Sequence, residues 1–148
     1  MPALKHKAFA YITHERRLLV FSHPNHPEAG IQVPAGTVEP GETPHAAALR
    51  EAAEETGLAG LTTAHFLGEH IRDMIDFDLA EVHHRYFYHL PYASNPPATW
   101  RHGEHSPSDR TLGPIVFEFF WAELPNKVPE LIADHGRFLL ELMKRFEE

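Results

Sequence analysis

The segment from residue 36 to residue 58 constrains the fold of this chain more than any other, because it predicts a helix with sharply defined ends. It reads GTVEPGETPHAAALREAAEETGL. Thr43 suits the N-cap, Pro44 suits the first helical turn and Gly57 is a typical helix stop. The alanine-rich residues between them favour helix. The sequence therefore predicts a loop, a helix and a second loop, set in a single domain over residues 1–148.

Apolar and aromatic runs on both sides of this helix predict β-strands. They lie at residues 7–12, 17–21, 31–36, 62–71, 82–90 and 115–124. Residues 91–114 are rich in Pro, Ser and Gly and predict one long loop. The apolar residues of the tail recur at helical spacing and predict an amphipathic helix over residues 129–148. Together these elements indicate an α/β fold in which a mixed β-sheet lies between helices.

Three carboxylates share one face of the helix predicted from residue 44 to residue 56. With Glu51 at the origin of a helical wheel, Glu55 lies about 40° to one side and Glu54 about 60° to the other. Like charges one turn apart destabilise a helix, and Arg50 can pair with Glu54 without offsetting all three. Such an acidic surplus suits hard divalent cations, which prefer carboxylate oxygens. From these residues alone, a solvated face with Glu–Arg pairs is the alternative.

The alanines predict how this helix packs. The wheel places Ala46, Leu49 and Ala53 opposite the acids, where they would pack on the sheet. Ala47 and Ala48 lie one turn before the acids, where small side chains would leave space for a metal–phosphate complex.

The spacing of the charged residues and glycines resembles the Nudix box. That motif is written G-x5-E-x7-R-E-U-x-E-E-x-G-U, where U is an apolar residue. Its fixed positions are all matched, by Gly36, Glu42, Arg50, Glu51, Glu54, Glu55 and Gly57. With each residue near ~6% of usage, a chance match is on the order of one in a hundred million per window. Ala52 departs from the usual pattern, because the family commonly has a bulkier aliphatic side chain there.

The resemblance implies a Nudix-type α/β/α sandwich and a divalent-metal-dependent hydrolase. Such an enzyme cleaves the pyrophosphate bond of a nucleoside diphosphate linked to another moiety. The implied cofactor is Mg²⁺ or Mn²⁺, which would neutralise the phosphates and activate water for attack at phosphorus. By position in the motif, Glu51, Glu54 and Glu55 would hold the metal, with the backbone carbonyl of Ala35 as a further ligand. A catalytically silent nucleotide-binding or sensor module on the same fold is the alternative.

The resemblance also implies catalytic roles. The implied catalytic set is Glu42, Arg50, Glu51, Glu54 and Glu55. The arginine would orient the carboxylates through salt bridges, and Glu42 would close the loop or join the metal network. The general base is not assigned by the motif, and Glu104 in the long loop and Glu118 in the last strand are candidates. A plain surface acid is the alternative for both.

Aromatic and basic residues outside the motif are candidates for substrate binding. Trp100 and Arg101 could stack on a base and contact a phosphate, and Tyr86 could line a base pocket. Ordinary loop and core packing are the alternatives. Arg72 and residues 73–75 stand where some subfamilies carry a proline or tyrosine marker, so the nucleotide is not identified.

Composition narrows the partners and the compartment. A formal net charge of −8 argues against binding of duplex nucleic acid, so a small nucleotide-type pyrophosphate is the expected partner. The absence of cysteine excludes disulfides and thiolate zinc sites. The histidines, 13 in all, include no HExxH pattern, and a dedicated histidine–metal site is not expected. No signal peptide or membrane span is expected, which favours the cytoplasm. A homodimer is common among the proteins that the chain resembles.

Overall fold

The computed structural model of the protein describes residues 1–104 and 115–147. Seven strands form one sheet in the order β4-β5-β1-β2-β7-β6, with β3 paired to β1 beside this path. The strands are β1 (Ala3–His14), β2 (Arg17–Ser22), β3 (Ala35–Thr37), β4 (His65–Asp73), β5 (Glu81–Pro91), β6 (Thr99–Glu104) and β7 (Ile115–Glu123). The α-helices are α1 (Pro44–Thr56) and α2 (Leu139–Arg145), and the short 3-10 helices are η1 (Pro27–Ala29), η2 (Ile75–Phe77) and η3 (Ile132–Asp134).

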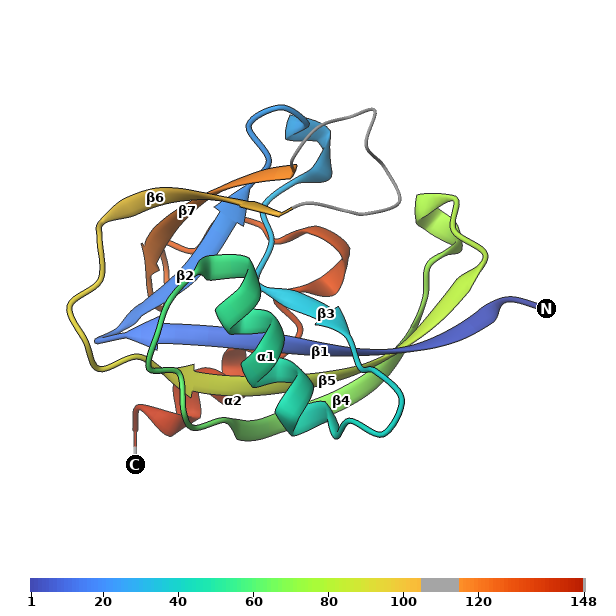
Figure 1. The fold of residues 1–148 in the computed structure, drawn as a ribbon, viewed down its shortest axis with the longest axis horizontal. Helices are drawn as coiled ribbons and strands as arrows, with labels where there is room; N and C mark the ends of the chain where they lie inside the picture. Colours follow the sequence, from blue (N-terminus) through green and yellow to red (C-terminus); the bar gives the residue numbers. More distant parts are fainter. Residues whose placement is uncertain (105–114, 148) are drawn as a thin grey trace.

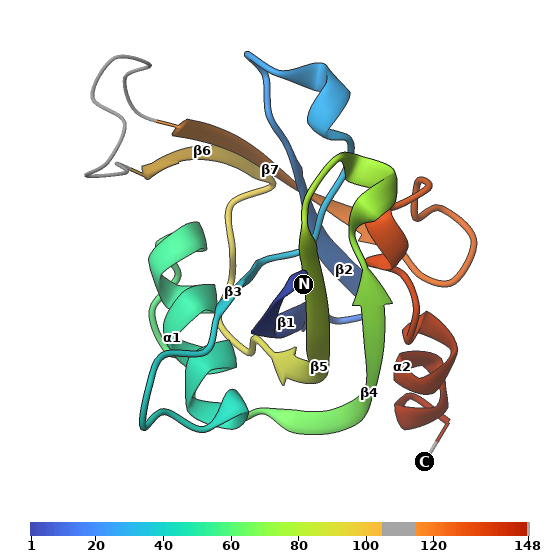
Figure 2. The same cartoon turned by 90° about the vertical axis from the view of Figure 1, so that its right-hand side faces the viewer.

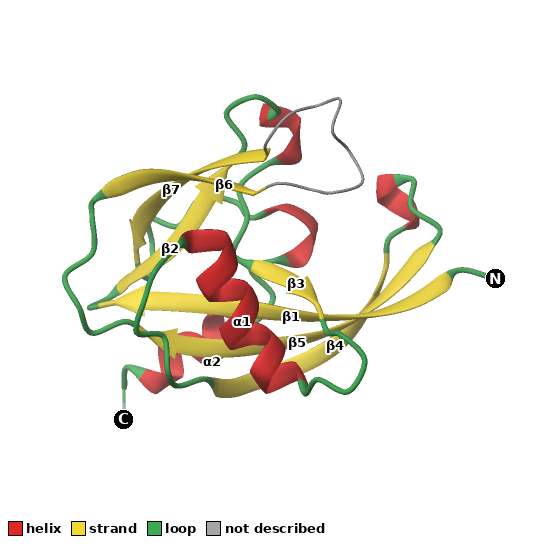
Figure 3. Cartoon of the chain, in the orientation of Figure 1, coloured by secondary structure: helices red, strands yellow, loops and turns green. Residues whose placement is uncertain are grey.

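The sheet is mixed and lies between the two α-helices. Strand β1 runs parallel to β5 and antiparallel to β2 and β3. Helix α1 crosses one face of the sheet (Figures 1 and 3), and the turned view places α2 on the other face (Figure 2). The predicted α/β/α arrangement is therefore confirmed. No helix in residues 1–104 and 115–147 is long and apolar enough to cross a membrane.

Two apolar clusters hold the helices to the sheet. Because side chains alternate along a strand, Ala8 and Ala10 of β1 face α1, whereas Phe9 and Tyr11 face the opposite side. The first cluster contains the buried alanines of α1, and the second contains Leu142 of α2. The central strand β1 thus fixes both helices relative to one another.

Helix α1 begins and ends where the sequence predicts. Thr43 Oγ1 accepts a hydrogen bond from the Ala46 amide at 3.1 Å, and Gly57 ends the helix in the left-handed region at φ 74°. These contacts satisfy backbone groups that the first and last turns leave without helical partners. A residue with a Cβ would be strained at the Gly57 backbone angle.

The predicted packing of the alanines in α1 was wrong. Ala47, Ala48 and Ala52 are fully buried against the sheet, whereas Ala46 and Ala53 are exposed. Of the residues predicted to pack on the sheet, Leu49 does so and is partly buried. The small side chains allow the helix to lie close to the strands instead of clearing space for a ligand. Of the acidic face, Glu51 and Glu55 turn toward the edge of β3, whereas Glu54 stays exposed.

The prediction of one loop over residues 91–114 was also wrong. Strand β6 lies inside this range and pairs antiparallel with β7, from Thr99 opposite Phe120 to Glu104 opposite Ile115. The Trp100 ring stacks on the Phe119 ring, with 5.1 Å between the ring centroids. Cross-strand packing of this kind overrides the loop-like local composition. Residues 105–114 of the predicted loop lie outside the described ranges.

The tail is less helical than its apolar periodicity predicts. Only Leu139–Arg145 forms an α-helix, and before it the backbone turns through positive φ at Ala133 and Asp134. This turn brings His135 to the face of the sheet that carries the second cluster. There its carbonyl accepts a hydrogen bond from the Tyr11 hydroxyl, and its Nδ1 accepts one from the Val33 amide at 3.2 Å. The predicted apolar stripe still packs into the second cluster, but through a turn followed by a short helix.

Candidate active site

Arg50 joins the loop before α1 to the acids of the helix itself. It donates two hydrogen bonds to Glu42, from Nε at 2.7 Å and from Nη2 at 3.0 Å. Its Nη1 donates to Glu51 at 2.8 Å and to Glu54 at 3.2 Å. Nη2 also donates to the Thr37 carbonyl of β3 at 3.1 Å. One planar guanidinium therefore fixes loop, helix and strand together, as its fork of donors allows.

The Arg50–Glu42 pair is charged over a wide pH range. The hydrogen bonds from Arg50, and next the one from the Glu39 amide, lower the pKa of Glu42 to about 2. The same pair raises the pKa of Arg50. Glu42 Oε1 accepts the Glu39 amide proton at 3.0 Å, so the carboxylate also closes its own loop. This arrangement supports a positioning role for both residues.

Glu51 occupies space that only a glycine leaves at position 36. A Cβ built on Gly36 would overlap the Glu51 side chain, from Cγ to the carboxylate oxygen. The Glu51 side chain is 15% exposed, and Arg50 holds its Oε1. The first glycine of the motif is therefore required for close approach of this carboxylate to β3.

Glu55 binds the strand on which the predicted carbonyl ligand lies. It is 6% exposed, and its Oε2 accepts the Ala35 amide proton at 2.7 Å. The Ala10 amide donates to the Pro34 carbonyl, and the Val38 amide donates to the His6 carbonyl. Between these two bonds, the backbone N–H and C=O groups of successive residues point alternately away from β1 and toward it. Both polar backbone groups of Ala35 thus point away from β1 and toward the side occupied by Glu55. Glu51, Glu55 and the Ala35 carbonyl converge on one edge of β3.

Two side chains of β6 hold the C-terminal end of α1. Trp100 Nε1 donates to the Thr56 carbonyl at 2.9 Å, and His102 Nε2 lies 3.0 Å from the Glu54 carbonyl. A carbonyl only accepts, so His102 must carry its proton on Nε2. These bonds satisfy carbonyls of the last helical turn and fix the part of α1 that carries the acids. Sequence reasoning missed His102, because β6 itself was not predicted.

The candidates outside the motif are not gathered at the edge of β3. Trp100 is packed between α1 and β7, as described above. Arg101 pairs with Glu118 at 3.3 Å, and both side chains are exposed. Glu118 alternates with Phe117 and Phe119, which pack in the cluster of α1, so it faces the other side of the sheet.

Tyr86 and Glu104 are the remaining candidates. The Tyr86 hydroxyl lies 3.3 Å from Nδ1 of both His6 and His84, on the α1 side of β5. Its ring stacks with those of His6 and His84. Glu104 ends β6, and its side chain lies outside the described part.

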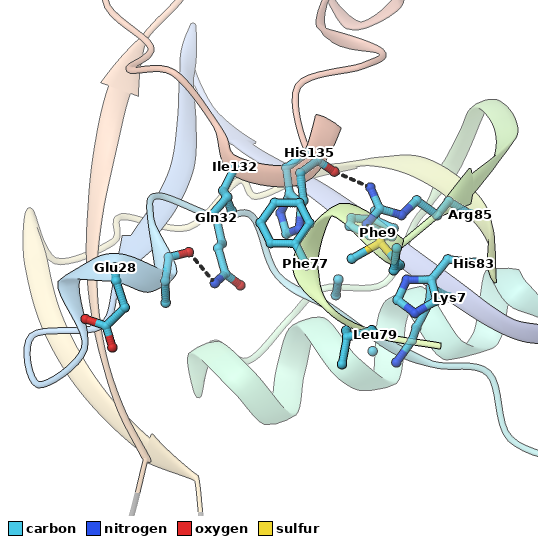
Figure 4. Close-up of a pocket in the computed structure, with 15 residues that line it drawn as sticks. Lys7, Phe9, Glu28, Gln32, Phe77, Leu79, His83, Arg85, Ile132 and His135 are labelled. Carbon is cyan, nitrogen blue, oxygen red and sulfur yellow. Dashed lines mark hydrogen bonds between the residues drawn. The ribbon is translucent and has the colours of Figure 1, made fainter. Parts of the chain in front are cut away.

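A cavity of about 330 Å³ opens beside β3. It is lined by Ala35 and Gly36, and on the neighbouring strands by Lys7, His83 and Arg85. Figure 4 shows these basic side chains at one end, with apolar residues from η2 and η3 forming a wall. Sequence reasoning missed this cavity, although basic residues inside strand patterns were a visible signal.

The donor set at the edge of β3 suits a hard divalent cation. Glu51 and Glu55 supply carboxylate oxygens beside a backbone carbonyl, and Glu54 is linked to Glu51 through Arg50. The vacant Cβ position of Gly36 provides the room that this approach needs. As placed, no group of three or more His, Asp or Glu side chains within residues 1–104 and 115–147 encloses a metal site. Coordination would therefore require these carboxylates to shift from their present hydrogen bonds.

Comparison with known proteins agrees with the fold and the motif. The family model of the NUDIX domain matches residues 4–121. The MutT NUDIX hydrolase from Burkholderia pseudomallei superimposes with a TM-score of 0.63 at 22% identity, over 94% of this chain and 98% of that chain. The MutT protein from Methanosarcina mazei Go1 gives a TM-score of 0.60 at 15% identity, over 99% of this chain and 94% of that chain.

A third solved structure is larger. It is the bifunctional NMN adenylyltransferase/ADP ribose pyrophosphatase from Francisella tularensis, complexed with AMP and a Mn ion. The TM-score is 0.65 at 17% identity, over 98% of this chain and 42% of that chain. At these identities the structural likeness establishes the shared fold.

Proposed function

The chain belongs to the NUDIX domain family of pyrophosphohydrolases, and from this premise we propose that it is a divalent-metal-dependent hydrolase. The proposed substrate is a nucleoside diphosphate linked to another moiety, cleaved at its pyrophosphate bond. The observation that carries the proposal is the convergence of Glu51 and Glu55 on the Ala35 edge of β3, with Glu54 tied to them through Arg50.

We propose Mg²⁺ or Mn²⁺ as the cofactor, held by Glu51, Glu54, Glu55 and the carbonyl of Ala35. The cation would supply charge neutralisation of the two phosphates and activation of water. Arg50 orients the carboxylates, because it binds one oxygen each of Glu51 and Glu54. This support acts in the way that residues around a metal site commonly tune its ligands.

The cavity beside β3 is the proposed site for the organic part of the substrate. It adjoins Ala35 and Gly36, so a molecule with its pyrophosphate at the β3 edge could extend directly into it. Its apolar wall, which includes Phe77 and Ile132, could exclude water from a sugar or a base. Glu118 lies on the face of the sheet opposite α1 and pairs with Arg101, which argues against it as a general base beside the acids of α1.

The Glu54→Gln variant tests the proposal. Glu54 is 53% exposed, so the substitution should leave the fold intact while removing one charged metal ligand. We expect kcat on a panel of nucleoside diphosphate derivatives to fall by about a hundredfold or more. Mn²⁺ binding, followed by electron paramagnetic resonance, should weaken in parallel.

The matched control is Glu15→Gln, at a surface turn where the side chain is 74% exposed. It removes the same charge and should change neither kcat nor Mn²⁺ binding. Unchanged turnover and unchanged Mn²⁺ affinity in Glu54→Gln would disprove the metal assignment. Tight nucleotide binding without turnover across the whole panel would instead favour a silent sensor.

A further inference from the structure

Arg85 is a buried cation to which the described residues supply no carboxylate. It is 2% exposed. Its guanidinium donates to the Ala133 carbonyl and to the sulfur of Met74 at 3.5 Å, and lies 4.8 Å from the centroid of the Phe9 ring. Within residues 1–104 and 115–147 its Nε has no hydrogen-bond partner. A buried charge without an opposite charge is costly, which makes this arrangement unusual for a purely structural residue.

The acids whose charge reaches Arg85 are bound to a different arginine. Arg72 binds both oxygens of Asp76, at 3.0 Å and 2.9 Å, and one oxygen of Asp134 at 2.8 Å. Burial, followed by the charge of Arg72, lowers the pKa of Arg85 to about 10. Arg85 therefore stays charged at neutral pH. Arg72 offsets one of the two negative charges, and neither Asp76 nor Asp134 forms a salt bridge with Arg85 among the described residues.

Lys7 adds a second cation beside Arg85. The two residues are directly opposite in the parallel pairing of β1 and β5, so their side chains share one face of the sheet. Lys7 Nζ donates to Thr37 Oγ1 at 2.8 Å, which is an uncharged acceptor. Both cations line the cavity and retain charge that their hydrogen-bond partners do not offset.

His83 completes this end of the cavity. Its Nε2 lies 2.8 Å from Glu81 Oε1, and a carboxylate only accepts, so the proton is on Nε2. Its Nδ1 is buried and has no hydrogen-bond partner in the part of the chain that the structure describes. Among the described residues that line the cavity, the only carboxylate is Glu28, which lies at the opposite end beside Gln32 (Figure 4).

We propose that Lys7, His83 and Arg85 form a binding site for a phosphate monoester carried by the part of the substrate that enters the cavity. A dianion complements the Lys7 and Arg85 cations and accepts several hydrogen bonds at once. Glu81 offsets part of the local charge through His83, and Asp76 and Asp134 act on Arg85 only at longer range. A bound anion would give the Arg85 guanidinium a direct anionic partner. The inference rests on the proposed function, because the phosphate belongs to the molecule that is cleaved at β3.

The separation of the two sites defines the substrate class. Strands β5, β1 and β3 are successive neighbours, so Arg85 and Gly36 lie two strand spacings apart, about 10 Å. This distance exceeds the spacing of two phosphorus atoms in one pyrophosphate. Lys7 lies between the two sites, since its Nζ donates to Thr37 of β3. A phosphate held by Arg85 and His83 of β5 is therefore additional to the cleaved pyrophosphate and separated from it by a spacer of about the size of a sugar.

Inorganic phosphate is the first probe, used with the metal-free protein. Titration should shift the Arg85 Nε–Hε resonance, and binding should weaken by at least about tenfold in Lys7→Met and in Arg85→Met. Lys5→Met is the matched control, since Lys5 lies on the same strand, is exposed and does not line the cavity. Phosphate that leaves the Arg85 resonance unmoved, or that binds all variants equally, would overturn the proposal.

Matched substrate pairs are the second probe. NADPH and NADH differ by one phosphate on a ribose, as do coenzyme A and dephospho-coenzyme A. With metal present, the phosphorylated member of a cleaved pair should have a kcat/KM at least about tenfold higher, and Lys7→Met should abolish this preference. Equal kcat/KM within every cleaved pair would overturn the inference while the proposed hydrolase stands. If no pyrophosphate is cleaved, the proposed function fails and the phosphate titration alone decides the anion site.

Discussion

Arg50 and Arg85 lie on either side of β3 and have opposite surroundings. Arg50 donates to three carboxylates and to one backbone carbonyl. Arg85 is more deeply buried, yet among the described residues it contacts only uncharged groups. The α1 side therefore has more acid than one arginine neutralises, whereas on the cavity side no carboxylate among the described residues is hydrogen-bonded to Lys7 or Arg85. A ligand that carries a metal-bound pyrophosphate at one end and a phosphate monoester at the other would complement both regions.

This difference predicts that Arg50 is required for stability as well as activity. Arg50→Met would leave Glu42 and Glu51 without the donor that orients them. We expect kcat to fall by about a hundredfold and the free energy of unfolding by about 1–3 kcal/mol, measured by steady-state kinetics and urea unfolding. Arg50→Lys keeps the positive charge but lacks the planar set of donors that binds several acceptors at once. It should therefore give losses of kcat and stability between those of Arg50→Met and the original protein. Full activity in Arg50→Met would mean that the acids orient themselves.

The position of Glu51 can be changed without altering any charge. In Gly36→Ala the new methyl group would displace the Glu51 side chain from the edge of β3. We expect kcat and Mn²⁺ affinity to fall by about ten- to a hundredfold. Gly41→Ala is the control in the same loop, since a Cβ at Gly41 meets nothing within 4 Å. Its positive φ of 80° should reduce stability slightly and leave Mn²⁺ affinity unchanged.

The two regions also differ in how far the sequence predicts them. The acidic region is local, since Thr43 and Gly57 fix the helix ends and the spacing from Gly36 onward fixes the carboxylates. The cavity is assembled from strands and turns far apart in the chain, such as Lys7 of β1 and Ile132 of η3. No local periodicity reports which strands become neighbours. The same limit explains β6, whose composition is that of a loop and whose pairing with β7 decides its structure.

Acid should destabilise the two regions over different pH ranges. Glu42, with its pKa lowered to about 2 from 4.5, contributes stability that is present above pH 4.5 and lost as the pH falls toward 2. Burial, and next the charge of Arg85, lowers the pKa of His135 to about 3 from 6.5. The unfolded chain therefore binds a proton at His135 that the fold does not, and stability falls as the pH drops from 6.5 toward 3.

The His135→Gln variant separates these ranges, because glutamine can still accept the Val33 amide proton. One proton corresponds to a slope of up to about 1.4 kcal/mol per pH unit. Urea unfolding between pH 6.5 and pH 4 should show a slope reduced by up to that amount in the variant. His89, with its pKa lowered to about 4 by burial, should keep part of the slope. An unchanged slope would mean that His135 protonates in the fold without penalty.

The smallest expected effect is the change in stability of Arg85→Met, and it is the sharpest contrast with Arg50→Met. A buried cation that lacks a carboxylate gains little from its surroundings, and an apolar side chain of similar length can replace it at low cost. The loss of the hydrogen bond to the Ala133 carbonyl opposes this gain by about 1 kcal/mol. We therefore expect the free energy of unfolding to stay within about 1 kcal/mol of the original protein, measured by urea unfolding at neutral pH. A loss as large as that of Arg50→Met would identify Arg85 as structural, whereas a stable variant with weakened phosphate binding would assign its charge to the ligand.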